Sequence, residues 1–225
     1  MLFENTEVFN FDGALRGMRN PKESWNKSDS EWETHINYNK DEVYTKFSIG
    51  KNDLKLAQTL IRAGSEHRKF MRQIFVSVDI TAPLYWWKEF DTYKVATVSN
   101  SCSTMHKLAD TPITLNCFEM DDFTPLIDNF KIDLSWRTVV SYLEQLRQKY
   151  NETKDKRYWK ELIRLLPESW LQKRTVTMNY ENLLGICSKG QRRFHKLTEW
   201  SVDFIQWARN LPYAQDLLFI DELNK

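Results

Sequence analysis

APLYWWKEFDTYK (residues 82–94), followed by VSNSCSTMH (residues 98–106), is the stretch of sequence that says most about the fold. Five aromatic side chains lie within its first thirteen residues, and a run of hydroxyl and amide side chains follows. Pro83 suits the first turn of a helix, because its missing N–H has no intrahelical partner to lose there. An inward-facing stripe at helical spacing is then predicted from Leu84, Trp87, Phe90 and Asp91. Two interpretations stay open: a core helix with a solvated face, and the aromatic floor of a pocket whose polar rim binds a planar ligand.

The charge balance argues against one class of function. Lysine and arginine together number 32 and aspartate and glutamate 31 in 225 residues, so no global basic field favours nonspecific binding of nucleic acid. An aromatic content of 14% indicates a folded protein, and we expect a single domain over residues 1–225. Glycine occurs only six times, and neither G-x-G-x-x-G nor G-x-x-x-x-G-K is present, which argues against a glycine-rich phosphate loop.

Cysteine usage and hydropathy predict a compartment. Cys102, Cys117 and Cys187 lack C-x-x-C spacing, so a reduced protein without structural zinc is expected. Residues 1–5 contain no basic region leading into an apolar stretch, so no signal peptide is expected. No run of about eighteen apolar residues predicts a membrane span. We therefore expect a soluble cytoplasmic protein with neither a membrane nor nucleic acid as a direct partner.

Apolar periodicity and chain-breaking residues predict mixed strands and helices, with helices dominating the C-terminal half. Strands are predicted at residues 7–11, 70–80 and 173–178. Helices are predicted at residues 12–21, 52–64 (with Asn52 as N-cap), 135–150 and 156–166, from Asn179, and from His195 or Thr198 onward. The polar residues 22–42 are predicted to form a long loop, and residues 109–133 to be mostly loop.

Several short motifs occur in an order that resembles one enzyme family. Glu66-His67 stands just before the strand predicted at residues 70–80. Leu166-Pro167 is followed, after eleven residues, by Asn179. Arg192-Arg193 then precede a histidine and a glutamate at the family's spacing, His195 and Glu199. Over about residues 50–210 this succession resembles the flavin-dependent thymidylate synthases; the resemblance rests on the order of the motifs, because no single one is specific.

The resemblance extends through the aromatic helix into the polar segment, with substitutions. The family motif is Arg-His-Arg-x-x-Ser-x-Asn-Glu-x-Ser-x-Arg-Tyr, and Tyr93-Lys94-Val95 occupies the Arg-His-Arg positions. Asn100 and Ser103 match the family's Asn and second Ser. The family's Glu, Arg and Tyr are replaced by Ser101, Met105 and His106. Glu181 stands where the family has an arginine on the flavin.

The resemblance implies an α+β fold with a central, mostly antiparallel sheet flanked by helices, assembled as a homotetramer. It implies transfer of a one-carbon (methyl) group to C5 of dUMP or a related pyrimidine deoxynucleotide. FAD is the implied cofactor, with folate and NADPH as co-substrates. Cofactor binding is implied for His67, Asn179 and His195. Substrate binding is implied for Tyr93, Lys94, Asn100, Ser101, Ser103, Arg192 and Arg193; no catalytic residue is assigned.

Two other interpretations remain open. The chain can be a noncatalytic relative that keeps the fold as a nucleotide-binding or assembly protein, and the replaced Arg-His-Arg supports that alternative. It predicts nucleotide binding without flavin. The chain can also be an unrelated α+β interaction protein whose motif matches arose by chance, which predicts neither ligand. Binding of FAD separates the enzyme from both.

Overall fold

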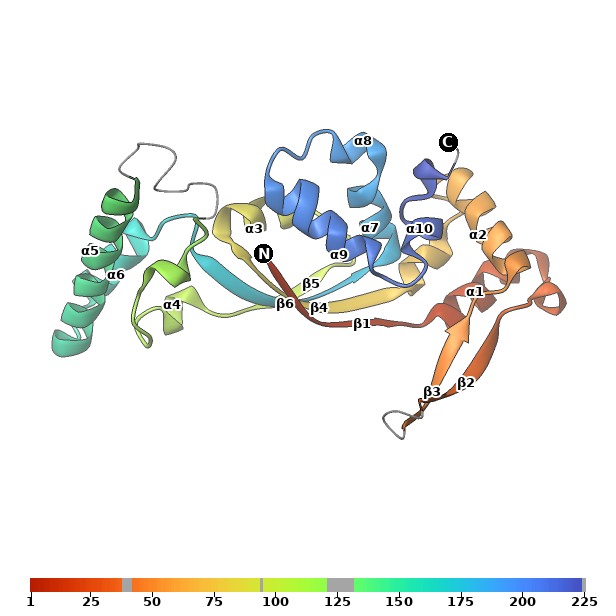
Figure 1. The fold of residues 1–225 in the computed structure, drawn as a ribbon, viewed down its shortest axis with the longest axis horizontal. Coiled ribbons are helices and arrows are strands. Elements are labelled where there is room, and N and C mark those ends of the chain that lie inside the picture. The colour runs from red at the N-terminus through yellow and green to blue at the C-terminus, as the bar shows by residue number, and fades with distance from the viewer. Residues whose placement is uncertain (38–41, 94, 121–131, 224–225) are drawn as a thin grey trace. The chain divides into compact units, whose positions relative to one another are not determined.

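Four strands from distant parts of the chain form the larger sheet. The structure is a computed structural model that describes residues 1–37, 42–93, 95–120 and 132–223. The strands are β1 (Leu2–Phe9), β4 (Phe75–Pro83), β5 (Val98–Ser101) and β6 (Leu171–Asn179). They are ordered β1-β4-β6-β5 (Figure 1). The predicted α+β fold with a mostly antiparallel sheet is confirmed.

Contacts within the chain divide the molecule into two compact units. The first unit comprises Met1–Leu2, Asp79–Tyr93 and Ser99–Thr175. The second comprises Phe3–Val78, Lys94–Val98 and Val176–Lys225. Within the described residues, no helix combines the length and apolar character needed to cross a membrane.

Strand β4 shows the alternation expected of a half-buried strand. Val76, Val78, Ile80 and Ala82 are fully buried, while the residues between them are partly exposed. The predicted start at residue 70 is wrong, because Lys69–Gln73 forms a 3-10 turn before the strand. That turn buries two consecutive apolar side chains, Phe70 and Met71, which a period of two cannot place on one face.

Helix α3 (Leu84–Phe90) of the first unit follows β4 directly and is a core helix. Pro83 is its N-cap rather than its first helical residue. Trp86, Trp87 and Phe90 are at most 2% exposed, and the Trp86 ring stacks on Phe90 with centroids 5.0 Å apart. Trp86 therefore belongs to the buried stripe, whereas Leu84, predicted to face inward, is only half-buried. The aromatic side chains at the centre of this segment form core rather than the floor of a pocket.

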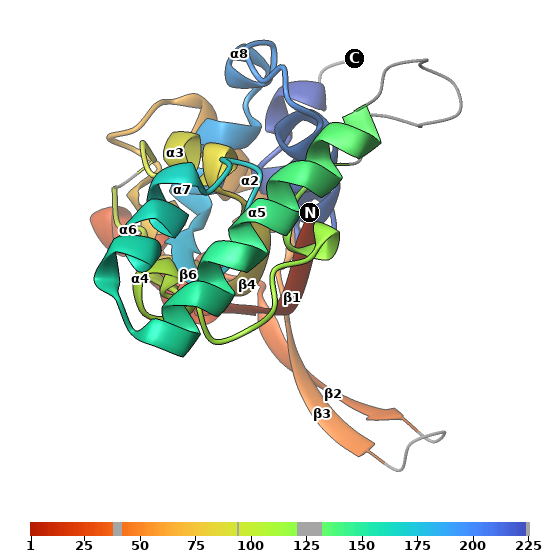
Figure 2. The same cartoon turned by 90° about the vertical axis from the view of Figure 1, so that its left-hand side faces the viewer.

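Two longer helices of the first unit form an antiparallel pair, α5 (Ile132–Thr153) and α6 (Lys156–Leu165) (Figure 2). Both predicted helices are confirmed, and α5 extends beyond residues 135–150 at each end. A short helix, α4 (Thr104–Lys107), precedes the loop predicted at residues 109–133. That loop contains a 3-10 turn at Leu115–Cys117, and its residues 121–131 lie outside the described part of the chain. One apolar cluster joins these segments: Leu108, Ile113, Phe118, Val140, Leu143, Leu146 and Leu162.

The second unit contains most of the remaining helices. They are α1 (Phe11–Arg19), α2 (Lys51–Arg62), α7 (Tyr180–Cys187), α8 (Lys189–Arg192), α9 (Ile205–Arg209) and α10 (Ala214–Leu217), with a π-helical segment at Glu199–Phe204. Helix α2 begins one residue before the predicted N-cap, and Gly64 follows its end with φ +109°, a conformation that favours glycine. Tyr180 anchors the core: its ring meets Phe11 edge-on at 5.5 Å, and its hydroxyl donates to the Pro212 carbonyl at 2.6 Å.

The prediction of a long loop over residues 22–42 is wrong. A two-stranded antiparallel ribbon occupies part of it, formed by β2 (Glu31–Asn37) and β3 (Glu42–Ser48); residues 38–41 lie outside the described part. In Figure 1 the ribbon extends away from helix α1. The sequence alternates tryptophan, threonine and isoleucine with polar residues along β2, and the abundance of polar residues hid that period of two.

A buried ion pair holds the chain between α1 and the ribbon. The Arg19 guanidinium, 5% exposed, donates from Nε to Asp53 Oδ1 of α2 at 2.6 Å. Ser28 and Ser30 donate their hydroxyls to the other carboxylate oxygen, each at 2.6 Å. Burial raises the pKa of Asp53, but the hydrogen bonds from Ser28, Ser30 and Arg19 outweigh it and hold the pKa below its usual value. The pair thus fastens residues 24–30 onto α2.

We predict that Asp53→Ala lowers the free energy of unfolding by about 3–5 kcal/mol, because it leaves the buried Arg19 without its counter-charge. Urea denaturation followed by circular dichroism measures the change. The matched control is Glu152→Ala, which removes an exposed i,i+3 partner of Lys149 and is expected to cost less than about 1 kcal/mol. Equal effects of the two variants would contradict a structural role for the buried pair.

A second prediction concerns acid stability. The Arg147 guanidinium lowers the pKa of Glu144 from 4.5 to about 2. A carboxyl whose pKa is lower in the folded state stabilises that state fully above its unfolded pKa, and the contribution is lost as pH falls through the folded pKa. Glu144→Gln should therefore weaken the pH dependence of unfolding between pH 4.5 and about 2. Denaturation curves of both proteins across that window measure the free energy of unfolding at each pH. If that free energy depended on pH equally in the variant and the wild type, the assignment would be wrong.

Candidate functional site

A cavity of about 1030 Å³ lies in the second unit, between the end of α1, helix α2 and the turn that follows α2. Met18 of α1, Leu56 and Leu60 of α2, and His67 and Phe70 of the turn contribute to its wall. We call it the His67 cavity. The volume is at the upper end of the range for small-molecule sites.

The turn that carries His67 is fixed at both ends. After Gly64, the His67 amide donates to the Gly64 carbonyl at 3.0 Å. Arg68 donates from Nε to both carboxylate oxygens of Glu181 in α7, at 3.0 and 3.2 Å. Phe70 is buried beyond it. The exposed His67 side chain is therefore presented to the cavity by a short, anchored turn.

The cavity combines apolar walls with a cationic rim. Lys22 and Lys27 lie on the exposed segment after α1, and within the described part of the chain neither forms an ion pair. Lys69 contacts Glu66 at 3.3 Å across an exposed surface, where water screens the pair. Arg19 also lines the cavity, but Asp53 occupies its guanidinium. Such a lining suits a ligand with a flat apolar body and an anionic group.

The polar segment after the aromatic helix lies in the first unit, beside β6. Asn100 and Ser101 are exposed at the end of β5, and Ser103 accepts a hydrogen bond from the His106 amide as N-cap of α4. The Cys102 amide donates to the Lys173 carbonyl at 2.9 Å. Of the predicted substrate residues, the structure gathers Asn100, Ser101 and Ser103 on this one segment, with Tyr93 half-buried after α3. Lys94 lies outside the described residues.

An arginine that sequence reasoning missed stands next to this segment. Arg174 of β6 donates to Asp91 at 2.9 Å and to the Gln172 side chain at 2.9 Å, and its guanidinium lies 4.2 Å from the centre of the Trp87 ring. Gln172 in turn donates to the Cys102 carbonyl at 2.9 Å. No sequence motif marks Arg174, because its partner Asp91 is 83 positions away. It orients the polar segment through Gln172.

Arg192 forms ion pairs with carboxylates of its own chain. Its guanidinium contacts Glu222 at 2.6 Å and Asp221 at 3.8 Å, near the C-terminal end of the described chain. Arg209 donates to both oxygens of Glu222 as well, at 3.0 and 2.9 Å. Arg209 lowers the pKa of Glu222 most, and Arg192 adds to the effect. Arg192 and Arg193 line a polar cavity of about 660 Å³ that also includes Lys189.

The other two predicted cofactor residues are buried. Asn179 caps α7: its side chain accepts a hydrogen bond from the Asn182 backbone amide at 3.0 Å, and the Asn182 side chain accepts one from the Asn179 backbone amide at 3.3 Å. His195 is 7% exposed, and its ring stacks on Trp200 with centroids 4.7 Å apart. Neither belongs to the lining of the His67 cavity. Within the second unit, the structure therefore separates His67 from Asn179 and His195.

Comparisons with known proteins find similarity in structure alone. No family model and no curated protein matches the sequence. The crystal structure of a flavin-dependent thymidylate synthase from Helicobacter pylori, complexed with FAD and dUMP, aligns with a TM-score of 0.64 over 98% of this chain and 99% of that chain, at 17% identity. A second structure of the Helicobacter pylori enzyme with FAD and dUMP gives a TM-score of 0.64 over the full length of both chains, at 18% identity. The chain has the flavin-dependent thymidylate synthase fold.

Two charged residues that the family resemblance singled out form ion pairs within this chain. Glu181, in the place of the family's arginine, is paired with Arg68 rather than exposed as a free carboxylate. Arg192, assigned to a phosphate by the resemblance, is paired with Glu222. Anion binding at Arg192 must therefore compete with an internal carboxylate.

If Arg192 holds the phosphate of dUMP, we predict that Glu222→Gln tightens dUMP binding by about threefold to tenfold. The reason is that a neutral amide competes less well than a carboxylate for the Arg192 guanidinium. Isothermal titration calorimetry measures the affinity. Glu152→Gln is the matched control, because Glu152 is exposed on α5 in the other unit. An unchanged affinity in Glu222→Gln, with the fold intact by circular dichroism, would remove Arg192 from the nucleotide site.

Proposed function

We propose that the protein is a flavin-dependent enzyme that transfers a one-carbon unit to C5 of dUMP or a related pyrimidine deoxynucleotide. The observation that carries the proposal is the His67 cavity, a large apolar cavity with a cationic rim, on a chain with the flavin-dependent thymidylate synthase fold. The two aligned structures contain FAD and dUMP. A bound FAD would supply the hydride, while the protein supplies binding and orientation.

The lining of the His67 cavity fits a flavin nucleotide. Leu56, Leu60 and Phe70 offer apolar surface to an aromatic ring. His67, with Lys22 and Lys27, offers hydrogen bonds and positive charge to a diphosphate. The volume, about 1030 Å³, is large enough for a ligand of this size. His67 is therefore the residue that we assign to the cofactor; Asn179 and His195 are assigned to the support of the fold around it.

The nucleotide is proposed to bind through the polar segment and the arginines. Asn100 and Ser101, both exposed, and Ser103 present amide and hydroxyl groups that match the uracil edge. Tyr93 offers a ring for stacking, and Lys94 a charge. Arg192 and Arg193 supply the phosphate site after Glu222 is displaced. Folate is the proposed one-carbon donor and NADPH the proposed reductant, in a cytoplasmic homotetramer whose sites are completed by neighbouring copies.

A second candidate is a noncatalytic nucleotide-binding protein with the same fold. The engagement of Arg192 by Glu222 and of Arg68 by Glu181 favours it, since both reduce the positive charge available to anionic ligands. The replacement of Arg-His-Arg by Tyr93-Lys94-Val95 points the same way. This candidate binds nucleotide but takes up no flavin.

We predict that the purified protein binds FAD and that His67→Ala weakens binding at least tenfold, by about 1.4 kcal/mol or more. Visible absorbance, before and after addition of FAD and removal of the unbound portion, measures occupancy. The matched control is His106→Ala, which removes a histidine exposed on α4 in the first unit. Full flavin retention in His67→Ala would exclude the assignment of His67.

Turnover is tested separately by release of tritium from C5 of labelled dUMP, with folate donor, NADPH and FAD supplied. Release above the level without protein supports the enzyme. A protein that binds dUMP but takes up no FAD and releases no tritium would support the noncatalytic candidate instead. A protein that binds neither ligand would leave only the fold.

A further inference from the structure

The polar segment from Asn100 to Ser103 lies at an edge of the larger sheet. Strand β5, which contains its first two residues, is the last strand in the order β1-β4-β6-β5, and every residue of β5 is exposed. Two hydrogen bonds from β6 hold the backbone of Cys102. Its amide donates to the Lys173 carbonyl at 2.9 Å, and its carbonyl accepts from the Gln172 side chain at 2.9 Å. One of the contacts that fix the segment is therefore made by a side chain.

The Gln172 amide meets its two partners in only one orientation. Gln172 is 7% exposed, and its side chain bonds both the Arg174 guanidinium and the Cys102 carbonyl. A guanidinium only donates and a carbonyl only accepts, so the amide oxygen has to face Arg174 and the amide nitrogen Cys102. A reversed amide would set donor against donor and acceptor against acceptor. Arg174 thus selects the orientation in which Gln172 holds the polar segment.

Arg174 is in turn fixed to helix α3. Its Nη1 atom donates to both carboxylate oxygens of Asp91, at 2.9 and 3.2 Å, and its guanidinium lies 4.2 Å from the centre of the Trp87 ring. Trp87 is 1% exposed, and its indole N–H donates to the Gln172 carbonyl. We call Asp91, Arg174 and Gln172 the Arg174 relay, since together they connect the end of α3 to the polar segment.

Arg174 is poorly suited to bind a ligand itself. Its side chain is only 14% exposed, and Asp91, Gln172 and the Trp87 ring already contact the guanidinium. Any effect of Arg174 on a ligand has to pass through the groups that it holds. Arg174 is therefore a positioning residue rather than a binding residue.

We propose that the Arg174 relay positions the polar segment for the uracil edge of the nucleotide. The proposal rests on the proposed function, in which Asn100, Ser101 and Ser103 meet that edge. A segment that is ordered before its ligand arrives binds more tightly than one that the ligand must order, because the entropy is lost during folding instead. Hydrogen bonds also weaken steeply away from linear geometry, so the backbone position of the segment decides how many the uracil edge can form.

Two substitutions in the full-length protein break the relay at different points. Arg174→Met removes the donor that orients the Gln172 amide. Gln172→Glu keeps an acceptor for Arg174 but removes the donor to the Cys102 carbonyl. Because Gln172→Glu leaves the contacts of Arg174 with Asp91 and Trp87 in place, it separates positioning of the segment from support of α3.

Each substitution should weaken dUMP binding, measured by isothermal titration calorimetry, by about fivefold or more, which corresponds to the loss of one hydrogen bond. Both act on the same contact, so the double variant should bind at most about twofold more weakly than the weaker of the two single variants. FAD affinity should stay within about twofold of the wild type, because the relay does not line the His67 cavity.

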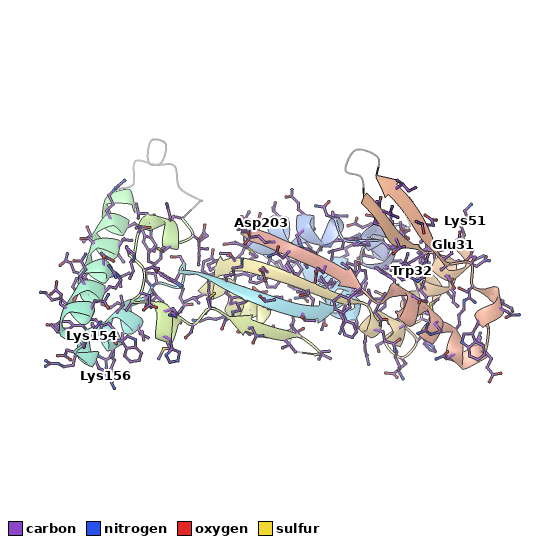
Figure 3. All side chains as sticks on the ribbon, turned by 90° about the horizontal axis from the view of Figure 1, so that it is seen from below. Glu31, Trp32, Lys51, Lys154, Lys156 and Asp203 are labelled. Carbon is purple, nitrogen blue, oxygen red and sulfur yellow. The ribbon has the colours of Figure 1, made fainter. Side chains whose placement is uncertain are left out.

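The matched control is Arg157→Met, next to Lys156 at the start of α6 (Figure 3). The Arg157 side chain is 89% exposed and its carboxylate partner, Asp155, is two positions away. Its loss should change dUMP affinity by less than about twofold, as expected of an exposed pair. Circular dichroism and urea denaturation check that all variants fold.

Hydrogen exchange, followed by mass spectrometry, measures the order of the segment without any ligand. In both relay variants the backbone amides from β5 to Cys102 should exchange about fivefold faster or more than in the wild type, as local opening becomes easier. The amides of α5 should exchange at the wild-type rate. This pattern would show that the relay orders the segment and leaves the rest of the first unit unchanged.

Three results would overturn the proposal: dUMP affinity at the wild-type level in both relay variants, unchanged exchange of the segment in both, and an equal loss of FAD affinity, which indicates a general loss of structure. A wild-type chain that binds no dUMP would overturn the proposed function and with it the role of the relay in binding. Hydrogen exchange distinguishes the two failures, because it shows whether Arg174 holds the segment even where no nucleotide binds.

Discussion

The indole N–H of Trp87 holds together the first unit of this protein. It donates to the Ala82 carbonyl at 3.1 Å and to the Gln172 carbonyl at 3.0 Å, so one buried donor links α3 to the ends of both β4 and β6. The Arg174 guanidinium lies on the face of the same ring and reaches Asp91 at the end of α3. A buried donor with no partner would cost more than the hydrogen bond itself contributes, so the position of α3 on the sheet is tightly constrained. The polar segment from Asn100 to Ser103 depends on that constraint, because Gln172 and Lys173 hold it through Cys102.

The distribution of free and engaged cations decides what the second unit can bind. Arg19, Arg68, Arg192 and Arg209 all have carboxylate partners in the chain, and the Arg19–Asp53 pair is fully buried. The lysines at the rim of the His67 cavity are the more available charges. A lysine is a flexible point charge without the planar fork that recognises phosphate in two places at once. The rim of the His67 cavity is therefore better equipped for electrostatic attraction of a phosphorylated ligand than for bidentate recognition by arginine. This difference makes flavin binding the decisive measurement.

The ribbon and strand β4 have the same alternation of apolar and polar residues but bury their apolar side chains to different extents. In β4, alternate residues are buried inside the chain that contains them. In β2 and β3, the same alternation leaves tryptophan, isoleucine and valine exposed.

The sequence by itself determined what depends on local pattern and order. The core helix after Pro83, the glycine that follows α2, the helices after residue 132 and the cap at Asn179 all follow from periodicity and from residues with special backbone or hydrogen-bonding properties. The succession of motifs from Glu66 to Glu199 pointed to the fold that structural comparison finds. Only the tertiary structure decided which cations are free, because the partners of Arg174 and Arg192 lie 83 and 30 positions away and no local pattern links them. The tertiary structure also decided that the polar stretch after α1 contains one strand of the β2–β3 ribbon. Strand pairing brings together residues from two segments, so the alternate residues form one face only when both strands are paired.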